Sequence, residues 1–110
     1  MIFWITGRKG SGKTTLSKRI AKQLNAIIID GDDIRNIICN DFSYEGRKSN
    51  QEIITNLALL FSNQGFNVVI ACVSPFLKLR KELQERLPGC IEIELPFGDL
   101  WKDTEYEETK

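Results

Sequence analysis

The hydrophobic positions of this chain change period where one predicted element gives way to the next. Residues 2–6, IFWIT, form a continuous apolar run typical of a β-strand buried on both faces. From Lys13 onwards an apolar residue recurs every fourth position, at Leu16, Ile20 and Leu24. Because lysines and an arginine occupy the other faces, this segment is predicted to be an amphipathic helix.

A second strand and a second helix follow in the same order. Residues 26–30, AIIID, predict another buried strand. A short helix is expected to run through Ile34 to Ile38, with Asp32 or Asp33 as its N-cap. The sequence DFSYEGR that comes next is predicted to be a loop.

A long helix is predicted over residues 48–64, and Gly65 stands where its C-terminal cap belongs. Its apolar stripe is predicted to consist of Ile53, Leu57, Leu60 and Phe61. Residues 67–73, NVVIACV, then predict a third buried strand. After it, Ser74 is expected to cap a helix whose first position is Pro75.

The final predicted strand differs from the other three. In residues 90–95, CIEIEL, isoleucines and leucine alternate with Glu92 and Glu94, which is typical of an edge strand or a half-solvated one. Residues 96–110 are polar, acidic and weakly patterned. We therefore expect a core of residues 1–95 and an acidic C-terminal tail over 96–110.

Three strand–helix repeats followed by a strand predict the α/β class, a three-layer α/β/α arrangement around a mostly parallel four-stranded sheet. Ligands of such sheets bind beyond the carboxyl ends of the strands. The unusual residues of this chain follow those ends, after Thr6, Ile29 and Val73. The sequence therefore predicts one site at one edge of the sheet.

Composition narrows the chemistry that this site can perform. The chain has 110 residues, three cysteines and no histidine, so zinc binding and a disulfide framework are both disfavoured, and Cys39, Cys72 and Cys90 are expected to be reduced core residues. Acid–base chemistry would have to use Asp, Glu, Lys, Tyr or Cys. With no apolar run near the roughly 20 residues that span a bilayer, a cytoplasmic location without membrane contact is expected.

Charge is balanced over the whole chain but unevenly distributed. Residues 1–89 carry 13 basic against 8 acidic residues, and residues 90–110 carry 2 against 7. A basic body suggests a small anionic ligand. A single-stranded nucleic-acid ligand is not expected, because the cations follow one loop rather than a face studded with aromatics.

The segment GRKGSGKTT carries the strongest signal. It fits G-x-x-x-x-G-K-[ST], the P-loop, in which glycines let backbone N–H groups converge on phosphate oxygens at a helix N-terminus. The expected ATP-binding residues are Gly7, Arg8, Lys9, Gly10, Ser11, Gly12, Lys13, Thr14 and Thr15. Lys13 would reach the β- and γ-phosphates, and the Thr14 hydroxyl would bind Mg²⁺.

The segment IIIDGDDIR adds two carboxylates at the end of the second strand. Asp30 and Asp32 could hold Mg²⁺ through water or accept a hydroxyl proton. The alternative for Asp32 is ordinary capping of the helix that follows.

Together, the P-loop, DGDDIR, FSYEGRKSN and SPF resemble motifs of the adenylylsulfate kinase family, in the same order and over about residues 2–95. The resemblance implies transfer of the γ-phosphate of ATP to the ribose 3′-hydroxyl of adenylyl sulfate. It implies Lys13, Asp32, Asp30 and Ser74 as catalytic residues, with Thr14 and Asp32 on the metal. It also implies an acceptor site formed by Arg35, Phe42, Arg47, Asn50 and Ser74.

Several of these assignments have alternatives. Phe42 could anchor a loop, Arg47 could be a solvated charge, and Ser74 could be a phosphorylated intermediate or a helix cap. Where the family has an arginine after SPF, this chain has Leu77, and where the family continues into a basic lid and a fifth strand, this chain has an acidic tail in which 100–102 only thinly resembles the lid. Another nucleotide acceptor, such as cytidine diphosphoramidate, and a non-catalytic nucleotide-binding module therefore stay open. A homodimer formed through residues 90–95 is also open.

Overall fold

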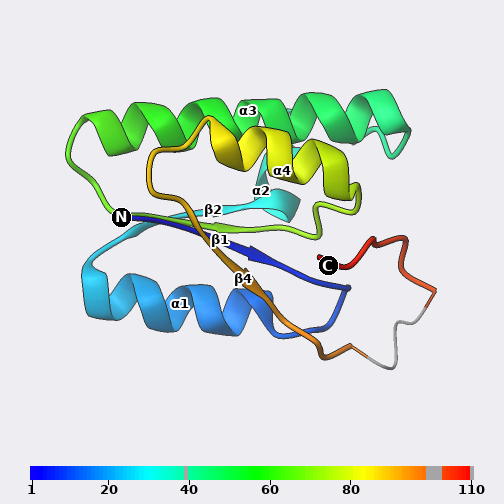
Figure 1. Cartoon of the computed structure of the whole chain (residues 1–110), viewed down its shortest axis with the longest axis horizontal. Coiled ribbons are helices and arrows are strands. Elements are labelled where there is room, and N and C mark those ends of the chain that lie inside the picture. Colours follow the sequence, from blue (N-terminus) through cyan, green and yellow to red (C-terminus); the bar gives the residue numbers. More distant parts are fainter. Residues whose placement is uncertain (39, 99–102, 110) are drawn as a thin grey trace.

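The structure is a computed structural model that describes residues 1–38, 40–98 and 103–109. Its centre is one sheet in which all pairings are parallel and the strand order is β2-β3-β1-β4 (Figure 1). The strands are β1 (Ile2–Thr6), β2 (Ile27–Asp30), β3 (Val68–Ala71) and β4 (Ile91–Glu94). The predicted α/β fold with a parallel four-stranded sheet is confirmed.

Helices cover both faces of this sheet. The four helices are α1 (Lys13–Leu24), α2 (Gly31–Ile37), α3 (Tyr44–Asn63) and α4 (Leu77–Glu85). In Figure 1, α3 and α4 lie on one face and α1 on the other, which gives the predicted three layers. None of the helices within the described residues is both long and apolar enough to cross a bilayer.

The core lies between the central strands and the α3–α4 layer. Trp4, Ile70 and Leu83 are all fully buried there, together with Ile54 and Ala58 of α3. Strands β1 and β3 are buried because they have neighbours on both sides and helices above and below, which explains their unbroken apolar sequences.

Helix α3 begins earlier than predicted and buries a different stripe. Ser43 is its N-cap and accepts a hydrogen bond from the backbone N–H of Gly46. The predicted stripe included Leu60, which is 50% exposed, whereas Ile54 and Ala58 are buried. The predicted stripe was partly wrong because a helix with several apolar rows does not reveal which row meets the sheet.

Two predicted helix caps were also wrong. Asp30, and not Asp32 or Asp33, caps α2, and its carboxylate accepts from the backbone N–H of Asp32 at 2.9 Å. Helix α4 begins at Leu77 rather than at Pro75, so Ser74 does not cap it. Residues that commonly cap helices are present at both places, but α2 begins directly after Asp30 and α4 begins three residues after Ser74.

Strand β4 is an edge strand, as predicted, but its acidic face is the better covered one. The Glu92 side chain is 15% exposed and that of Glu94 is 27% exposed, while Ile91 is 41% exposed. The acidic side chains are covered because α4 presents the fully buried Arg80 to them. Dimer formation through this edge stays a prediction.

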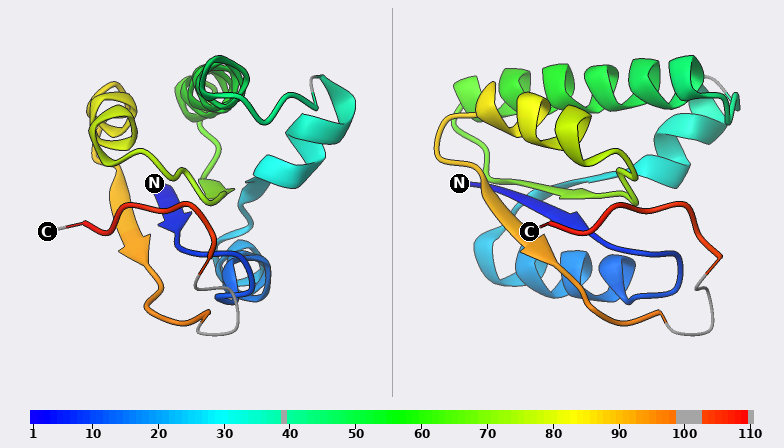
Figure 2. Two further views of the ribbon diagram at one scale, coloured as in Figure 1. Left: turned by 90° about the vertical axis from the view of Figure 1, so that its right-hand side faces the viewer. Right: turned by 45° about the vertical axis from the view of Figure 1, so that its right-hand side comes forward.

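Residues 103–109, the longer of the two described stretches of the acidic tail, are called the tail segment. Figure 2 shows it, in red, crossing in front of the end of the sheet to which β1 points. Its backbone pairs with the core where the Glu107 N–H donates to the Pro75 carbonyl at 2.8 Å. The predicted resemblance of 100–102 to a lid, and Cys39, lie outside the described residues.

Candidate functional site

A cavity of about 830 Å³ opens at the carboxyl end of the sheet. Five parts of the chain line it: the P-loop, the β2–α2 junction, the α3 face with Phe42 before it, the segment after β3, and the tail segment. Its size falls in the range of small-molecule sites. The prediction that the residues following β1, β2 and β3 gather at one edge of the sheet is confirmed.

The P-loop bends sharply between β1 and α1. Gly10 and Gly12 have φ values of 76° and 97°, and Gly12 is the N-cap of α1. A left-handed backbone is accessible to glycine at little cost and is strained for other residues. The glycine spacing of the motif therefore fixes the turn that points the loop and the α1 N-terminus at the cavity.

Lys13 folds back over this turn. Its Nζ donates to the carbonyl oxygens of Gly7 at 3.1 Å and Arg8 at 2.8 Å, and lies 3.4 Å from the Ser11 hydroxyl. Burial lowers the pKa of Lys13 below 10.5, and the negative charges of Asp32 and Asp30 oppose that shift. The ammonium group lines the cavity, held by weak neutral acceptors that a phosphate oxygen can replace.

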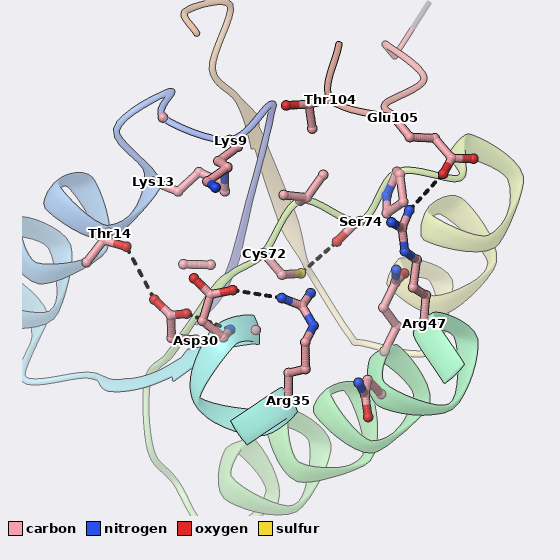
Figure 3. A pocket seen from close by; sticks show the side chains of 18 of the residues that line it. Lys9, Lys13, Thr14, Asp30, Arg35, Arg47, Cys72, Ser74, Thr104 and Glu105 are labelled. Carbon is pink, nitrogen blue, oxygen red and sulfur yellow. Dashed lines mark hydrogen bonds and ion pairs between the residues drawn. The ribbon is translucent and has the colours of Figure 1, made fainter. Parts of the chain in front are cut away.

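Thr14 and Asp30 bring two oxygen donors together below the P-loop. The Thr14 hydroxyl donates to Asp30 Oδ2 at 3.3 Å (Figure 3). Within 1–38, 40–98 and 103–109, no three acidic or cysteine side chains gather as a metal site. These two residues thus offer a small set of oxygen donors rather than a complete cage.

Asp32 pairs with an arginine while it stays close enough to Lys13 for its charge to act on that lysine. Its Oδ1 lies 3.0 Å from Arg35 Nη1 on the same helix, and its side chain is 82% exposed. Asp30 is therefore next to the predicted metal-binding threonine, whereas Asp32 is next to a predicted acceptor-binding arginine. The sequence predicted both carboxylates at the site but did not indicate that they would contact different residues.

Phe42 presents an open ring between two arginines. The ring is 55% exposed, and the guanidinium carbons of Arg35 and Arg47 lie 4.6 Å and 6.0 Å from its centroid. All three side chains line the cavity. An exposed aromatic face flanked by cations suits a planar, anionic ligand.

Ser74 has an unusual backbone and a fully engaged hydroxyl. Its φ is 49°, and its side chain is buried. Its Oγ accepts from Trp4 Nε1 at 3.1 Å and lies 2.6 Å from Cys72 Sγ. Strain of this kind in a cavity wall is a feature of functional sites, and here the hydrogen bonds and the Arg80 contact with the Ser74 carbonyl maintain it.

Cys72 lines the cavity beside Ser74 but is not a reactive thiol. Burial raises its pKa to about 11, which keeps it protonated at neutral pH. Cys72 and Cys90 are both free, as the sequence predicted.

The tail segment forms a wall of the cavity that sequence reasoning missed. Asp103, Thr104 and Glu105 line it, and Glu105 Oε2 lies 2.9 Å from Arg47 Nη1. Beyond the cavity, Glu108 Oε1 lies 2.8 Å from Arg8 Nη1. The opposite charges of body and tail were visible in the sequence, but no pattern there indicated which residues would meet.

Most residues predicted for the site line this cavity. They are Lys9, Gly10, Gly12, Lys13, Thr14, Thr15, Asp30, Asp32, Arg35, Phe42, Arg47, Asn50 and Ser74. Gly7, Arg8 and Ser11 do not line it. Ser11 is buried beneath the loop, and Arg8 turns towards the tail segment.

A parallel three-layer fold with a P-loop, two carboxylates at the end of β2 and an aromatic–arginine cluster defines the class of P-loop kinases. A profile of the family described as Adenylylsulphate kinase matches residues 1–109. This chain belongs to the adenylylsulphate kinase family.

Relatives of known name agree with that placement. The probable adenylyl-sulfate kinase of Bacillus subtilis is 41% identical over 91 residues, which cover 76% of this chain and 46% of that protein. Its counterpart from Pyrococcus abyssi is 31% identical over 97 residues, covering 82% of this chain and 56% of that protein. The chain thus spans about half the length of these relatives.

A solved structure provides the same comparison in three dimensions. The APS kinase CysC of Mycobacterium tuberculosis, in complex with AMPPNP and APS, superposes with a TM-score of 0.75 at 25% identity. The match covers 84% of this chain and 59% of that one. The predicted fold and family are therefore confirmed.

Proposed function

We propose that this chain binds ATP at its P-loop and transfers the γ-phosphate to the ribose 3′-hydroxyl of adenylyl sulfate or a closely related nucleotide. The observation that carries the proposal is one cavity with two chemically different ends. The P-loop and Lys13 form one end, and Arg35, Phe42 and Arg47 form the other. A phosphoryl donor and a planar anionic acceptor can therefore meet within a single space.

The donor end supplies positive charge without large rearrangement. Lys13 exchanges its carbonyl partners for phosphate oxygens, and the α1 N-terminus adds its dipole. Such groups stabilise charge on the transferring phosphoryl group more than they stabilise the ground state.

Magnesium fits the same end. Mg²⁺ in kinase sites uses one or two protein oxygens together with phosphates and water, and the Thr14–Asp30 pair is a donor set of that kind. When bound, the ion would neutralise charge on the β- and γ-phosphate oxygens. Asp32 was expected on the metal, but Asp30 contacts Thr14, so we assign Asp30 to the metal side and Asp32 to the acceptor side.

The acceptor end positions the nucleophile. Phe42 stacks on the acceptor base, Arg35 and Arg47 bind its anionic groups, and Asn50 contributes a hydrogen-bonding amide. Asp32 lies between this cluster and the P-loop, where its carboxylate can orient the acceptor hydroxyl and accept its proton. With no histidine in the sequence, a carboxylate is the plausible base.

Ser74 is assigned a positioning role. Its hydroxyl is buried and engaged by Trp4 and Cys72, which does not suit a group that must attack a phosphoryl donor. Its left-handed backbone instead fixes the wall between the donor and acceptor ends.

A second candidate function is nucleotide binding without turnover. The observation that favours it is the tail segment, because Glu105 already pairs with Arg47, a cation of the cavity that a phosphate ligand would otherwise use. Other nucleotide acceptors, including cytidine diphosphoramidate, fit the kinase proposal equally, since stacking on Phe42 tolerates any base.

Lys13→Ala tests the kinase proposal. It removes a charge aimed at the transferring phosphoryl group, so transfer should fall at least about a hundredfold. Transfer from ATP to adenylyl sulfate and other nucleotides is measured directly, with Lys18→Ala, an exposed lysine of α1, as control. A loss below about threefold would remove the P-loop from the catalytic centre. ATP binding without transfer to any acceptor in the parent protein would establish the second candidate instead.

A further inference from the structure

The acceptor end of the cavity contains a carboxylate that the predicted kinase site does not require. Glu105 Oε2 lies 2.9 Å from Nη1 of Arg47, and both side chains line the cavity. Figure 3 shows Glu105 pointing from the tail segment to Arg47, across the cavity from Arg35. Arg47 is thus already paired at the position where an acceptor anion would bind.

Contacts outside the cavity hold Glu105 in this place. The adjacent Tyr106 donates from its hydroxyl to Glu94 Oε2 at 2.6 Å, and its ring lies against Arg80, 5.0 Å from the guanidinium carbon. Arg80 is fully buried and donates to the Glu107 carbonyl at 2.8 Å and the Thr109 hydroxyl at 3.0 Å.

Releasing the tail segment would remove hydrogen-bond partners from the fully buried Arg80 and from the partly exposed Glu94. Arg80 would lose two acceptors, and Glu94 would lose the hydroxyl of Tyr106 and the backbone N–H of Thr109. Unpaired buried donors of a charged group are costly. The tail segment is therefore a fixed wall of the cavity, and its Glu105 side chain, 61% exposed, remains beside any bound acceptor.

Glu105 changes the charge that an acceptor meets. Arg35 is paired with Asp32, and Arg47 with Glu105, so each of these two acceptor-side guanidinium groups has a carboxylate within 3.0 Å. A phosphate group that approaches Arg47 gains attraction from the guanidinium and repulsion from Glu105. Both energies grow with the charge of the phosphate, so Glu105 cancels more of the attraction of a dianion than of a monoanion.

We propose that Glu105 is a specificity-determining residue that selects acceptors whose phosphate carries a single negative charge. These are nucleotides with a substituted phosphate, in an anhydride, ester or amide, as opposed to free phosphate monoesters, which are dianions above their second pKa of about 6. The inference rests on the proposed function, because it concerns the acceptor end of the same cavity.

The test compares two ligands that differ mainly in charge. Adenosine 5′-monophosphate is a dianion at about pH 7.5, and its O-methyl ester is a monoanion with the same base and ribose. Both are titrated calorimetrically into the full chain saturated with a non-hydrolysable ATP analogue and Mg²⁺. Glu105→Gln is expected to shift the ratio of the two dissociation constants towards the monophosphate about fivefold relative to the parent protein.

Three further variants separate charge from other effects. Glu105→Lys should shift the ratio further in the same direction, and Glu45→Gln, which removes an exposed carboxylate two residues from Arg47, should not shift it. In the Arg47→Ala background, Glu105→Gln should lose most of its effect, because Arg47 no longer holds the phosphate beside position 105.

An unchanged ratio in Glu105→Gln, or an equal shift in Glu45→Gln, would overturn the assignment of Glu105 while leaving the kinase proposal intact. Failure of the parent protein to bind the ATP analogue at all would instead overturn the proposed function, and with it this inference. Binding of the ATP analogue alone should be the same in Glu105→Gln as in the parent protein.

Discussion

The two ends of the cavity are built in different ways. Apart from Asp30, the donor end comes from residues that are neighbours in sequence, and its shape depends on backbone turns at Gly10 and Gly12. The acceptor end comes from side chains of distant segments: Arg35 on α2, Phe42 in a loop, Arg47 on α3 and Glu105 in the tail segment. A local backbone site is specified by a short motif, whereas a site of distant side chains depends on the whole fold.

Substitutions are expected to act differently at the two ends. Removing one side chain from the donor end leaves its backbone N–H groups and helix dipole in place. The acceptor end depends on a wall held by Arg80, Tyr106 and two glutamates, so a change far from the ligand can disturb it. Substitutions at the donor end should therefore affect chemistry, and substitutions at the acceptor end should affect chemistry and local stability together.

Asp32→Asn is expected to have the largest effect on catalysis. An amide cannot accept the hydroxyl proton, so phosphoryl transfer should fall about a thousandfold while ATP binding is retained. Single-turnover transfer and calorimetric ATP binding are measured in parallel. Asp33→Asn, an exposed neighbour on α2, is the control. Unchanged transfer would exclude Asp32 as the base.

Arg80→Ala is expected to have the largest effect on stability. Glu92 and Glu94 would keep their burial but lose a fully buried guanidinium, which should cost about 3 kcal/mol of unfolding free energy. Denaturant unfolding measures this loss, and hydrogen exchange should show faster exchange of the tail-segment amides. Lys78→Ala, an exposed position on α4, should be nearly neutral. If the tail amides exchange no faster, Arg80 does not hold the acceptor wall.

Phe42→Ala should weaken binding of the acceptor and leave binding of ATP nearly unchanged. Loss of one stacked base costs about 1–3 kcal/mol, so the KM for the acceptor should rise about tenfold while the KM for ATP stays nearly unchanged. Phe66→Ala, an exposed aromatic near the start of β3, serves as the matched control. An equal rise in both KM values would mean that Phe42 supports the loop instead of the acceptor.

The smallest expected effect is on the pH dependence of stability. Burial opposes ionisation of Glu92, but hydrogen bonds from Gln84, Lys81 and Thr109 outweigh it and hold the pKa of Glu92 below 4.5. Its ionised form therefore contributes stability above about pH 4.5, and that contribution, less than about 1 kcal/mol, is lost as the pH falls through the folded-state pKa. Glu92→Gln should flatten unfolding free energy against pH between about 5 and 3, whereas Glu85→Gln should leave the slope unchanged.

The sequence by itself determined the class of fold and the position of the P-loop. Continuous apolar runs predicted three of the four strands, and β1 and β3 are buried as expected. The prediction that residues 26–30 form a buried strand was partly wrong, because β2 is the second edge of the sheet and Ile28 is 38% exposed. The P-loop was predicted residue by residue, since glycines and a lysine at fixed spacing dictate a local backbone shape.

Only the tertiary structure decided which carboxylate contacts Thr14, which contacts Arg35, and which segment of the chain covers Arg47. Asp30 and Asp32 are equivalent in sequence, but the cap of α2 turns Asp30 towards Thr14 and leaves Asp32 beside Arg35. The pairing of Glu105 with Arg47 joins residues 58 positions apart. Charge complementarity acts through space and leaves no periodic trace along the chain, so this contact becomes visible only when the sheet brings both segments to the same edge.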